Sequence, residues 1–310
     1  MEKIIVISRK TRLDSLVVRF NTRQQAQFYV ERLGGDFSDY EREHQVYYQA
    51  LEKLVSHAEQ FGNVQVIDWK FLPNFIFGPH DLVLTVGQDG LVANALKYLE
   101  SQKLIGFNSD PSRWDGTLSN FQVEEALKII PDSFENKSLV KQITKAKVVL
   151  SDGQALYAVN DFFIGIKNHS SARYIISAEG KSEYHSSSGV IISTPLGASG
   201  WMKSIVEGAA KIVGGLEGKP HELQQKIPDW SEDTLTYAVR EPFPSVNTKT
   251  DLVFGKVNSR SLLKLESKMG DDGFIFSDGV QDDFLNFNYS IIASFGLAET
   301  KGSLVVKAKK

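Results

Sequence analysis

The sequence predicts an α/β domain with a parallel sheet, followed by a β-rich domain. Apolar strand-like runs alternate with helical patterns up to about residue 131, which is typical of a parallel sheet covered by helices. Beyond that point, extended segments follow one another through connections too short for parallel crossovers, which favours antiparallel sheets. The 310 residues suffice for two domains. We therefore expect the domains to span residues 1–131 and 132–287.

The first domain begins with a nearly continuous apolar run at residues 3–8, which is typical of a buried strand. Ser38 and Glu41 have the spacing of a capping box, so we expect a long helix to begin at Ser38. We expect glycines to end this helix and also the helix that precedes it at residues 22–33. Helices are expected at residues 22–33, 38–61 and 91–100, and further strands at 64–68, 81–86 and 103–107.

The second domain opens with a hairpin signal, because the turn Ser151-Asp152-Gly153 separates two extended segments, 141–150 and 154–159. One segment, residues 200–213, has a helical pattern, and Gly214-Gly215 is expected to stop it. The remaining strands are expected at residues 173–178, 189–193, 234–239, 251–254, 261–266 and 273–276.

Composition narrows the function classes. The 35 Lys and Arg residues and 38 Asp and Glu residues give a net charge of −3, which argues against a broad nucleic-acid surface. The chain has no cysteine, so disulfides, thiolate metal sites and cysteine nucleophiles are excluded. No apolar run approaches the roughly 18 residues of a membrane helix, and the apolar run near the start is too short for a signal peptide. We expect a cytoplasmic protein without membrane or nucleic-acid partners.

The best candidate for a chemical site is Gly87-Gln88-Asp89-Gly90, between a predicted buried strand and a helix. Ligands of open α/β sheets bind at the carboxyl ends of strands, and the helix that follows offers free N–H groups to phosphate. A carboxylate there can accept a proton from an attacking hydroxyl. The alternative is an Asp-Gly turn in which Asp89 caps the helix.

Three other segments combine small, hydroxyl and amide residues where strands end. Residues 191–201 (IISTPLGASGW) contain hydroxyls at a helix entrance, which act as caps or contact ribose and phosphate. Asn160-Asp161 pairs an amide with a carboxylate, which suits two hydrogen bonds to a ribose or base, or a simple turn. Residues 106–111 (GFNSDP) follow the last strand of the predicted parallel sheet.

In this order, the four segments resemble the ATP–NAD kinase family, in the wider group that includes diacylglycerol, sphingosine and phosphofructokinase-like kinases. Residues 87–91 resemble the family's GGDGT loop, and Asn160-Asp161 resembles its Asn-Glu pair. Residues 193–201 resemble the STPTGSTAY segment, and residues 106–111 resemble a GINTDP-type segment. Asp278-Gly279 resembles a late Asp-Gly of the family.

The resemblance implies an NAD kinase-like fold, with a two-sheet β-rich domain and a C-terminal segment, 288–310, that rejoins the first domain. It implies a homodimer or homotetramer that transfers the γ-phosphoryl group of ATP, with Mg²⁺ held by the nucleotide phosphates and not by the protein, to the 2′-hydroxyl of NAD. Asp89 would be the base, and Gly87, Gln88 and Gly90 the phosphate loop. Acceptor binding would fall to Asn160, Asp161, Thr194, Ser199, Gly200, Trp201 and Ser204, with Asn108, Asp110 and Ser188 as candidate further contacts.

Several positions depart from the family pattern. Gln88 replaces a glycine of GGDGT, Leu91 replaces its threonine, and Ser188 stands where the family usually has an aspartate. Leu196, Ala198, Ser199, Gly200 and Trp201 also differ from the STPTGSTAY segment. Three hypotheses therefore stay open: an NAD kinase; a kinase of the same fold acting on a sugar, lipid or other nucleoside; and a non-catalytic protein that binds NAD(P) or ATP.

Overall fold

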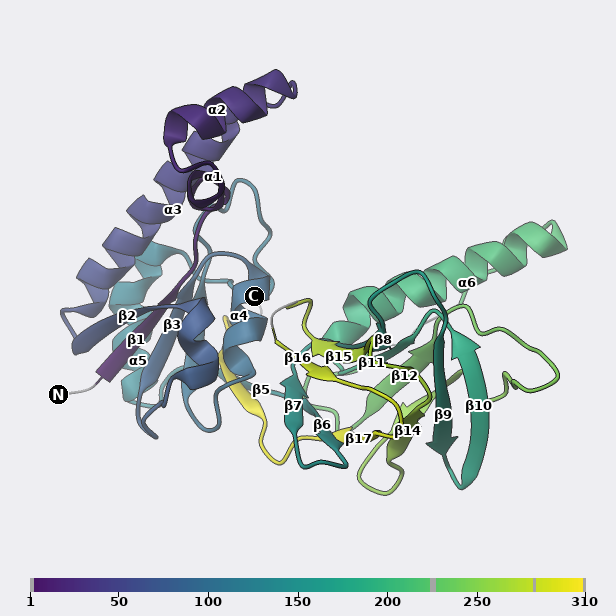
Figure 1. Cartoon of the computed structure of the whole chain (residues 1–310). Helices are drawn as coiled ribbons and strands as arrows, with labels where there is room; N and C mark the ends of the chain where they lie inside the picture. Colours follow the sequence, from purple (N-terminus) through teal and green to yellow (C-terminus); the bar gives the residue numbers. More distant parts are fainter. Residues whose placement is uncertain (1–2, 224–226, 281–282, 309–310) are drawn as a thin grey trace. The chain divides into compact units, whose positions relative to one another are not determined.

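The computed structural model describes residues 3–223, 227–280 and 283–308, and it divides into two compact units (Figure 1). One unit consists of Met1–Lys141 together with Gly302–Lys310, and the other of Gln142–Lys301. The predicted boundary after residue 131 falls within helix α5 (Ala126–Phe134). The segment that returns to the first unit begins at Gly302.

The first unit contains a six-stranded sheet in the order β2-β1-β3-β4-β18-β5. The pairs β2–β1, β1–β3, β3–β4 and β4–β18 are parallel, so the predicted parallel sheet is confirmed. The last strand of the chain, β18, lies between β4 and β5. The strands are β1 (Lys3–Ser8), β2 (Asn63–Asp68), β3 (Leu82–Val86), β4 (Lys103–Phe107), β5 (Val140–Ile143) and β18 (Gly302–Val305).

Helices cover both faces of this sheet. Alternate strand residues such as Leu84 and Ile105 pack in one core with α3 (Phe37–Ala58) and α5. Gly106 points the other way, because a Cβ placed on it would meet Val92 of α4 (Asp89–Leu96) at 2.8 Å. Since neighbouring strand residues face opposite sides, α4 lies on the face opposite α3 and α5.

Two short helices, α1 (Arg12–Phe20) and α2 (Arg23–Arg32), follow β1 in the chain and precede α3. They share a small hydrophobic core with α3. Helix α2 was expected, whereas α1 was not, although Thr11 begins it with a complete capping box. The predicted cap of α3 was wrong: Asp36 accepts the hydrogen bond from the Ser38 N–H, so the helix begins one residue earlier.

The second unit is a pair of antiparallel six-stranded sheets, ordered β10-β9-β14-β17-β6-β7 and β13-β12-β11-β8-β15-β16. One continuous core fills the space between them, where Phe162 meets Phe295 edge-on at 5.8 Å. The predicted fold class is therefore confirmed. The first sheet contains β6 (Ala146–Leu150), β7 (Ala155–Ala158), β9 (Ala172–Ala178), β10 (Lys181–Ser187), β14 (Leu263–Ser267) and β17 (Ile292–Leu297); the second contains β8 (Asp161–Ile166), β11 (Val190–Ser193), β12 (Leu235–Val239), β13 (Phe254–Val257), β15 (Gly273–Ser277) and β16 (Phe284–Asn286).

Three predictions for this unit were wrong in their bounds. The extended segment expected at residues 141–150 is divided between β5, in the sheet of the first unit, and β6. The strand expected at residues 251–254 lies at β13, which begins only at Phe254. Helix α6 (Trp201–Glu217) continues through Gly214-Gly215 and ends at Gly218, which has the left-handed φ of 67°. A glycine costs a helix interior about 1 kcal/mol and does not end it; a left-handed residue at the C-terminus does. Among the described residues, no helix combines the length and apolarity needed to span a membrane.

Candidate functional site

The strand order of the first unit reverses direction between β1 and β3. Strands β1 and β3 are neighbours, but the chain leaves β1 towards α3 on one face and leaves β3 towards α4 on the other. Ligands of open α/β sheets bind at such a reversal, outside the carboxyl ends of the two strands. Arg9 follows β1 at this point, and Gly87 follows β3.

The predicted phosphate loop lies here. Gly87 has a φ of 145°, which a residue with a side chain rarely adopts, and its N–H donates to the carbonyl of Phe107 at 2.8 Å. Gln88 occupies the N-cap position of α4 and makes no side-chain cap bond. A Cβ on Gly90 would meet nothing within 4 Å, so the loop surface is open there.

Asp89 is the first residue of α4 and not its cap, so the alternative interpretation of Asp89 as the N-cap residue was wrong. Its carboxylate accepts four hydrogen bonds: from the N–H groups of Thr117 (2.9 Å), Leu118 (3.0 Å) and Ser119 (2.9 Å), and from the Ser119 hydroxyl (2.8 Å). These bonds fasten the start of α4 to residues 117–119. Oδ1 accepts three of these bonds and Oδ2 only one, so Oδ2 can still accept a hydrogen bond from the hydroxyl of a substrate.

Asn108 and Asp110 organise the loop after β4. The Asn108 side chain accepts from the Asp110 N–H and donates to the Trp114 carbonyl. Asp110 Oδ1 accepts from both the backbone and the hydroxyl of Ser112. Asp110 Oδ2 is buried and has no partner among the described residues. Both side chains therefore hold the loop in shape.

An ion-pair cluster that the sequence analysis missed lies beside this loop. Glu43 of α3 binds both Arg9 and Arg12, and Asp39 binds both Arg12 and Arg113. Burial would raise the pKa of the Glu43 carboxyl, but hydrogen bonds from Arg12 and Arg9 outweigh it and hold that pKa below its usual value. The signal in the sequence was acidic residues four apart on a helix, facing basic residues distant along the chain.

In the second unit, the predicted pair Asn160-Asp161 is held by Asp278. The Asp278 carboxylate accepts from the backbone N–H groups of Val159 (3.0 Å), Asn160 (2.6 Å) and Asp161 (3.2 Å). Asp278 itself has a φ of 55°, and its N–H donates to the Asp161 carbonyl at 2.9 Å. The late Asp-Gly thus fixes the backbone of the pair. The side chains of Asn160 and Asp161 have no hydrogen-bond partner among the described residues.

The segment after β11 packs directly on this pair. The Thr194 hydroxyl donates to the Val159 carbonyl at 2.5 Å, and its N–H donates to the Asn160 carbonyl at 2.9 Å. A Cβ placed on Gly197 would lie 2.1 Å from the Asn160 carbonyl oxygen, so this position admits only glycine. The structure therefore brings together two segments that are more than 30 residues apart in sequence.

Asp161 has an unusual titration. Its residue is 9 % exposed, and this burial, with the nearby charge of Asp278 as a second cause, raises its pKa to about 7. The Asp278 carboxylate accepts three backbone N–H bonds, which favour its charged form, so Asp161 is the member of the pair that takes up the proton. Near neutral pH, Asp161 can donate or accept a hydrogen bond.

The remaining predicted acceptor residues begin α6. The hydroxyls of Ser199 and Ser204 donate to the carbonyls of Leu196 and Gly200 in the preceding turn, which is ordinary local hydrogen bonding within a helix. Trp201 stacks on Phe163 of β8, with ring centroids 5.5 Å apart and an interplanar angle of 18°. Ser188 is exposed at the turn before β11, and its N–H donates to the Arg240 carbonyl. Arg240 also lies over the Trp201 ring, at 5.7 Å from the centroid.

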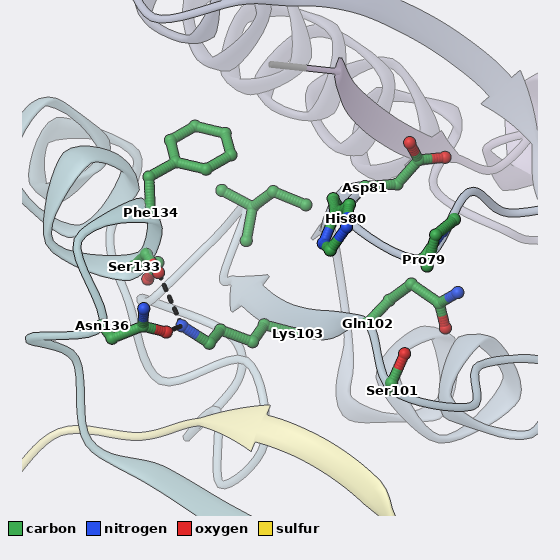
Figure 2. Close-up of a pocket in the computed structure, with 10 residues that line it drawn as sticks. Pro79, His80, Asp81, Ser101, Gln102, Lys103, Ser133, Phe134 and Asn136 are labelled. Atoms are coloured by element: carbon green, nitrogen blue, oxygen red, sulfur yellow. Dashed lines mark hydrogen bonds between the residues drawn. The ribbon is translucent and has the colours of Figure 1, made fainter.

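A cavity of about 380 Å³ lies at the opposite, amino edge of the first unit's sheet (Figure 2). The Lys103 ammonium lies in it and donates to the Ser133 carbonyl (2.6 Å) and the Asn136 side chain (2.7 Å). Burial lowers the Lys103 pKa. Because this cavity is at the amino ends of β3 and β4, it is separate from the loop that follows β3. Among the described residues, no group of three or more His, Asp or Glu could hold a metal ion.

Comparison with known proteins identifies the fold. Among solved structures, the chain is similar to yeast NADH kinase, which was solved in complex with NADH. The TM-score is 0.64 and the identity 14 %, and the match covers 99 % of this chain and 84 % of the yeast chain. The chain thus has the fold of the NAD kinases. No family model matches the sequence, and no curated protein matches it.

Proposed function

We propose that this protein is a phosphotransferase of the NAD kinase type, which transfers the γ-phosphoryl group of Mg²⁺–ATP to the 2′-hydroxyl of NAD or NADH. The fold of a NADH kinase supports the class of reaction. The protein would work as a homodimer or homotetramer, as the family resemblance implies.

The observation that carries the proposal is that the side chains of Asn160 and Asp161, an amide and a carboxyl group, make no hydrogen bond to described residues. Both side chains lack partners among the described residues, whereas the backbone that carries them is fixed from both sides by Asp278 and Thr194. A rigid backbone with two uncommitted polar side chains is suited to bind a ligand that offers both donors and acceptors, as the hydroxyls of a ribose do. Trp201, next to the same segment, adds an aromatic face.

In the proposed reaction, the 2′-hydroxyl oxygen attacks the γ-phosphorus in line, and the bond from that phosphorus to the bridging oxygen of ADP breaks. Such transfer is catalysed mainly by positioning and by stabilisation of charge. Gly87, Gln88 and Gly90 would hold phosphate at the start of α4. Asp89 would accept the hydroxyl proton on Oδ2, which accepts a single hydrogen bond from the protein. Bound to the nucleotide phosphates, Mg²⁺ would supply neutralisation of their charge.

The test is a coupled assay for NADP⁺ formed from ATP, Mg²⁺ and NAD⁺, with Asp89→Asn beside the wild type. We expect turnover in the wild type and its loss in Asp89→Asn, with NAD⁺ binding by calorimetry retained. Ser119→Ala is the matched control, because it removes one donor to Asp89 and leaves the carboxylate in place. Wild-type turnover in Asp89→Asn would exclude Asp89 as the base.

A second candidate is a non-catalytic protein that binds NAD(P) or ATP. The observation in its favour is that the Asp89 carboxylate already accepts four hydrogen bonds from residues 117–119, which gives it a structural role. Binding of NAD⁺ or ATP without turnover would favour this candidate. ATP consumption only with a sugar, lipid or other nucleoside would instead favour a kinase with another acceptor, for which the exposed Ser188 is the first residue to revert to aspartate.

A further inference from the structure

Three arginines surround the reversal point between β1 and β3. Arg9 follows β1, Arg12 begins α1, and Arg113 lies in the loop after β4. Glu43 and Asp39, from successive turns of α3, bind them in a chain: Arg9 to Glu43, Glu43 to Arg12, Arg12 to Asp39, and Asp39 to Arg113. Three guanidinium groups face two carboxylates, so the arginine cluster keeps one uncompensated positive charge.

Arg9 is the member next to the phosphate loop. A Cβ placed on Gly87 would lie 3.5 Å from Arg9 Nε. The guanidinium is fixed in place by the Glu43 carboxylate at 3.1 Å and by the Tyr47 ring, whose centroid is 5.0 Å away. Its side chain is 19 % exposed, so it is held by the protein and still reaches solvent.

Most of the hydrogen-bonding capacity of Arg9 is unused. Only two of its five N–H groups donate to described residues, one to the Lys10 carbonyl and one to Glu43. The Nε atom is buried and has no partner. A buried cationic donor without an acceptor is rare, and next to the predicted phosphate loop it points to an anion that supplies the missing oxygen atoms.

The nearby carboxylate of Asp89 does not neutralise this charge by an ion pair. Its four hydrogen bonds go to residues 117–119 and not to an arginine. Gln88 replaces a glycine of the family's phosphate loop, so this loop offers less room for a close backbone approach to phosphate. A fixed guanidinium fork binds phosphate oxygens in pairs and provides what the altered loop lacks.

We propose that the arginine cluster of Arg9, Arg12 and Arg113 binds the linear polyphosphate of the phosphoryl donor, with Arg9 in direct contact with its oxygen atoms. This proposal rests on the proposed function, because it names the part of the phosphoryl donor that the arginine cluster binds. The polyphosphate could belong to a nucleoside triphosphate or to inorganic polyphosphate, which offer the same oxygen atoms.

The test is calorimetry on the full chain with AMP, ADP, ATP and inorganic tripolyphosphate, for the wild type, Arg9→Gln and Arg113→Gln. The control is Arg23→Gln, because Arg23 also binds a single carboxylate of α3, Glu41, but lies outside the cluster. We expect wild-type affinity to rise with each added phosphate. Arg9→Gln should lose about tenfold or more for ATP and tripolyphosphate and little for AMP, and Arg23→Gln should lose nothing.

Wild-type affinity for ATP and tripolyphosphate in Arg9→Gln would overturn the proposal, and so would a wild type that binds neither. Tighter binding of ATP than of tripolyphosphate would assign a nucleotide donor, and equal binding would assign inorganic polyphosphate. Both outcomes support the proposal that the arginine cluster binds the donor's phosphates. If Arg9→Gln fails to fold, Arg113→Gln becomes the test variant. In that variant Asp39 still forms its ion pair with Arg12.

The same variants separate this proposal from the proposed function. Arg9-dependent binding without NADP⁺ formation would support the cluster and count against the NAD kinase reaction. Equal NADP⁺ formation by the wild type and Arg9→Gln would support the reaction and count against the cluster.

Discussion

At the scale of single residues, the second unit contains a buried carboxyl group that changes charge near neutral pH. Folding moves Asp161 beside Asp278 and out of water, which raises its pKa to about 7 from an ordinary 3.8. In the unfolded chain the same group is ionised above about pH 4. Between these values the folded protein binds more protons than the unfolded chain. The contribution of Asp161 to the free energy of unfolding therefore falls as the pH rises from about 4 through 7.

Asp161→Asn should remove this dependence. The neutral amide carries no charge into the buried site, so the variant should be more stable than the wild type at pH 8, by at most about 4 kcal/mol, and the difference should shrink towards pH 4. Urea unfolding at pH 4.5 and pH 8 measures it. The control is Asp152→Asn in an exposed turn of the same unit. A constant difference between Asp161→Asn and the wild type at both pH values would contradict this account.

At the scale of elements, contact between the β7–β8 corner and the turn after β11 shapes the candidate acceptor site. Gly197→Ala would place a methyl group 2.1 Å from the Asn160 carbonyl oxygen, so the two segments must separate. We expect a loss of about 1–3 kcal/mol in the free energy of unfolding and weaker NAD⁺ binding. Calorimetry and urea unfolding would measure the two effects together.

The control for that variant lies in the next element, α6. Gly208→Ala adds a methyl group in a helix interior where nothing lies within 4 Å. It should stabilise the protein by about 0.5–1 kcal/mol, the opposite sign, and leave NAD⁺ binding unchanged. Equal effects of the two substitutions would refute the close-contact argument.

Most elements could be predicted from periodicity and end signals, and the failures have physical causes. Strand β4 was predicted with its true bounds, because a short apolar run between polar residues has few alternatives. Helix α1 was missed because a nine-residue helix depends on packing against α2 and α3, which sequence patterns do not contain. Strand β10, KSEYHSS, is polar even on its buried face, where Glu183, His185 and Ser187 lie, and its pairing with β9 supplies the stability that its composition lacks.

The candidate site was predictable where residues lie together along the chain and not where folding brings them together. The loop at Gly87–Gly90 and the pair at Asn160-Asp161 carry local turn and amide signals. The contact of Asp278 with that pair spans more than 100 residues, so only the resemblance had drawn attention to it. The arginine cluster and its carboxylates come from separate segments, and the spacing of Asp39 and Glu43 on α3 does not identify the arginines that fold against them.

At the scale of the whole molecule, the first unit is not continuous in the chain. Its strand β18 lies inside the sheet, paired with β4 in parallel and adjacent to β5, and comes from the last residues. A Cβ on Gly302 would press on Leu96 of α4 at 2.9 Å, so the strand is also packed closely under that helix. An internal strand cannot be removed without exposing two rows of backbone hydrogen-bonding groups.

Deletion of residues 302–310 should therefore unfold the first unit and leave the second folded. Hydrogen exchange should show lost protection in β1, β3 and β4 and retained protection in the antiparallel sheets. Deletion of residues 306–310 alone, which keeps β18, is the matched control. Retained protection of β4 in the longer deletion would show that the sheet closes without β18.

The position of β18 also sets an order of events during synthesis. The 160 residues Gln142–Lys301 stand between the body of the first unit and its last strand. At about 5–20 residues per second, a ribosome needs on the order of ten to thirty seconds to add them. Throughout that time one side of β4 has no partner strand in the part of the chain already made. The unit whose synthesis begins first is thus the last to receive all of its strands.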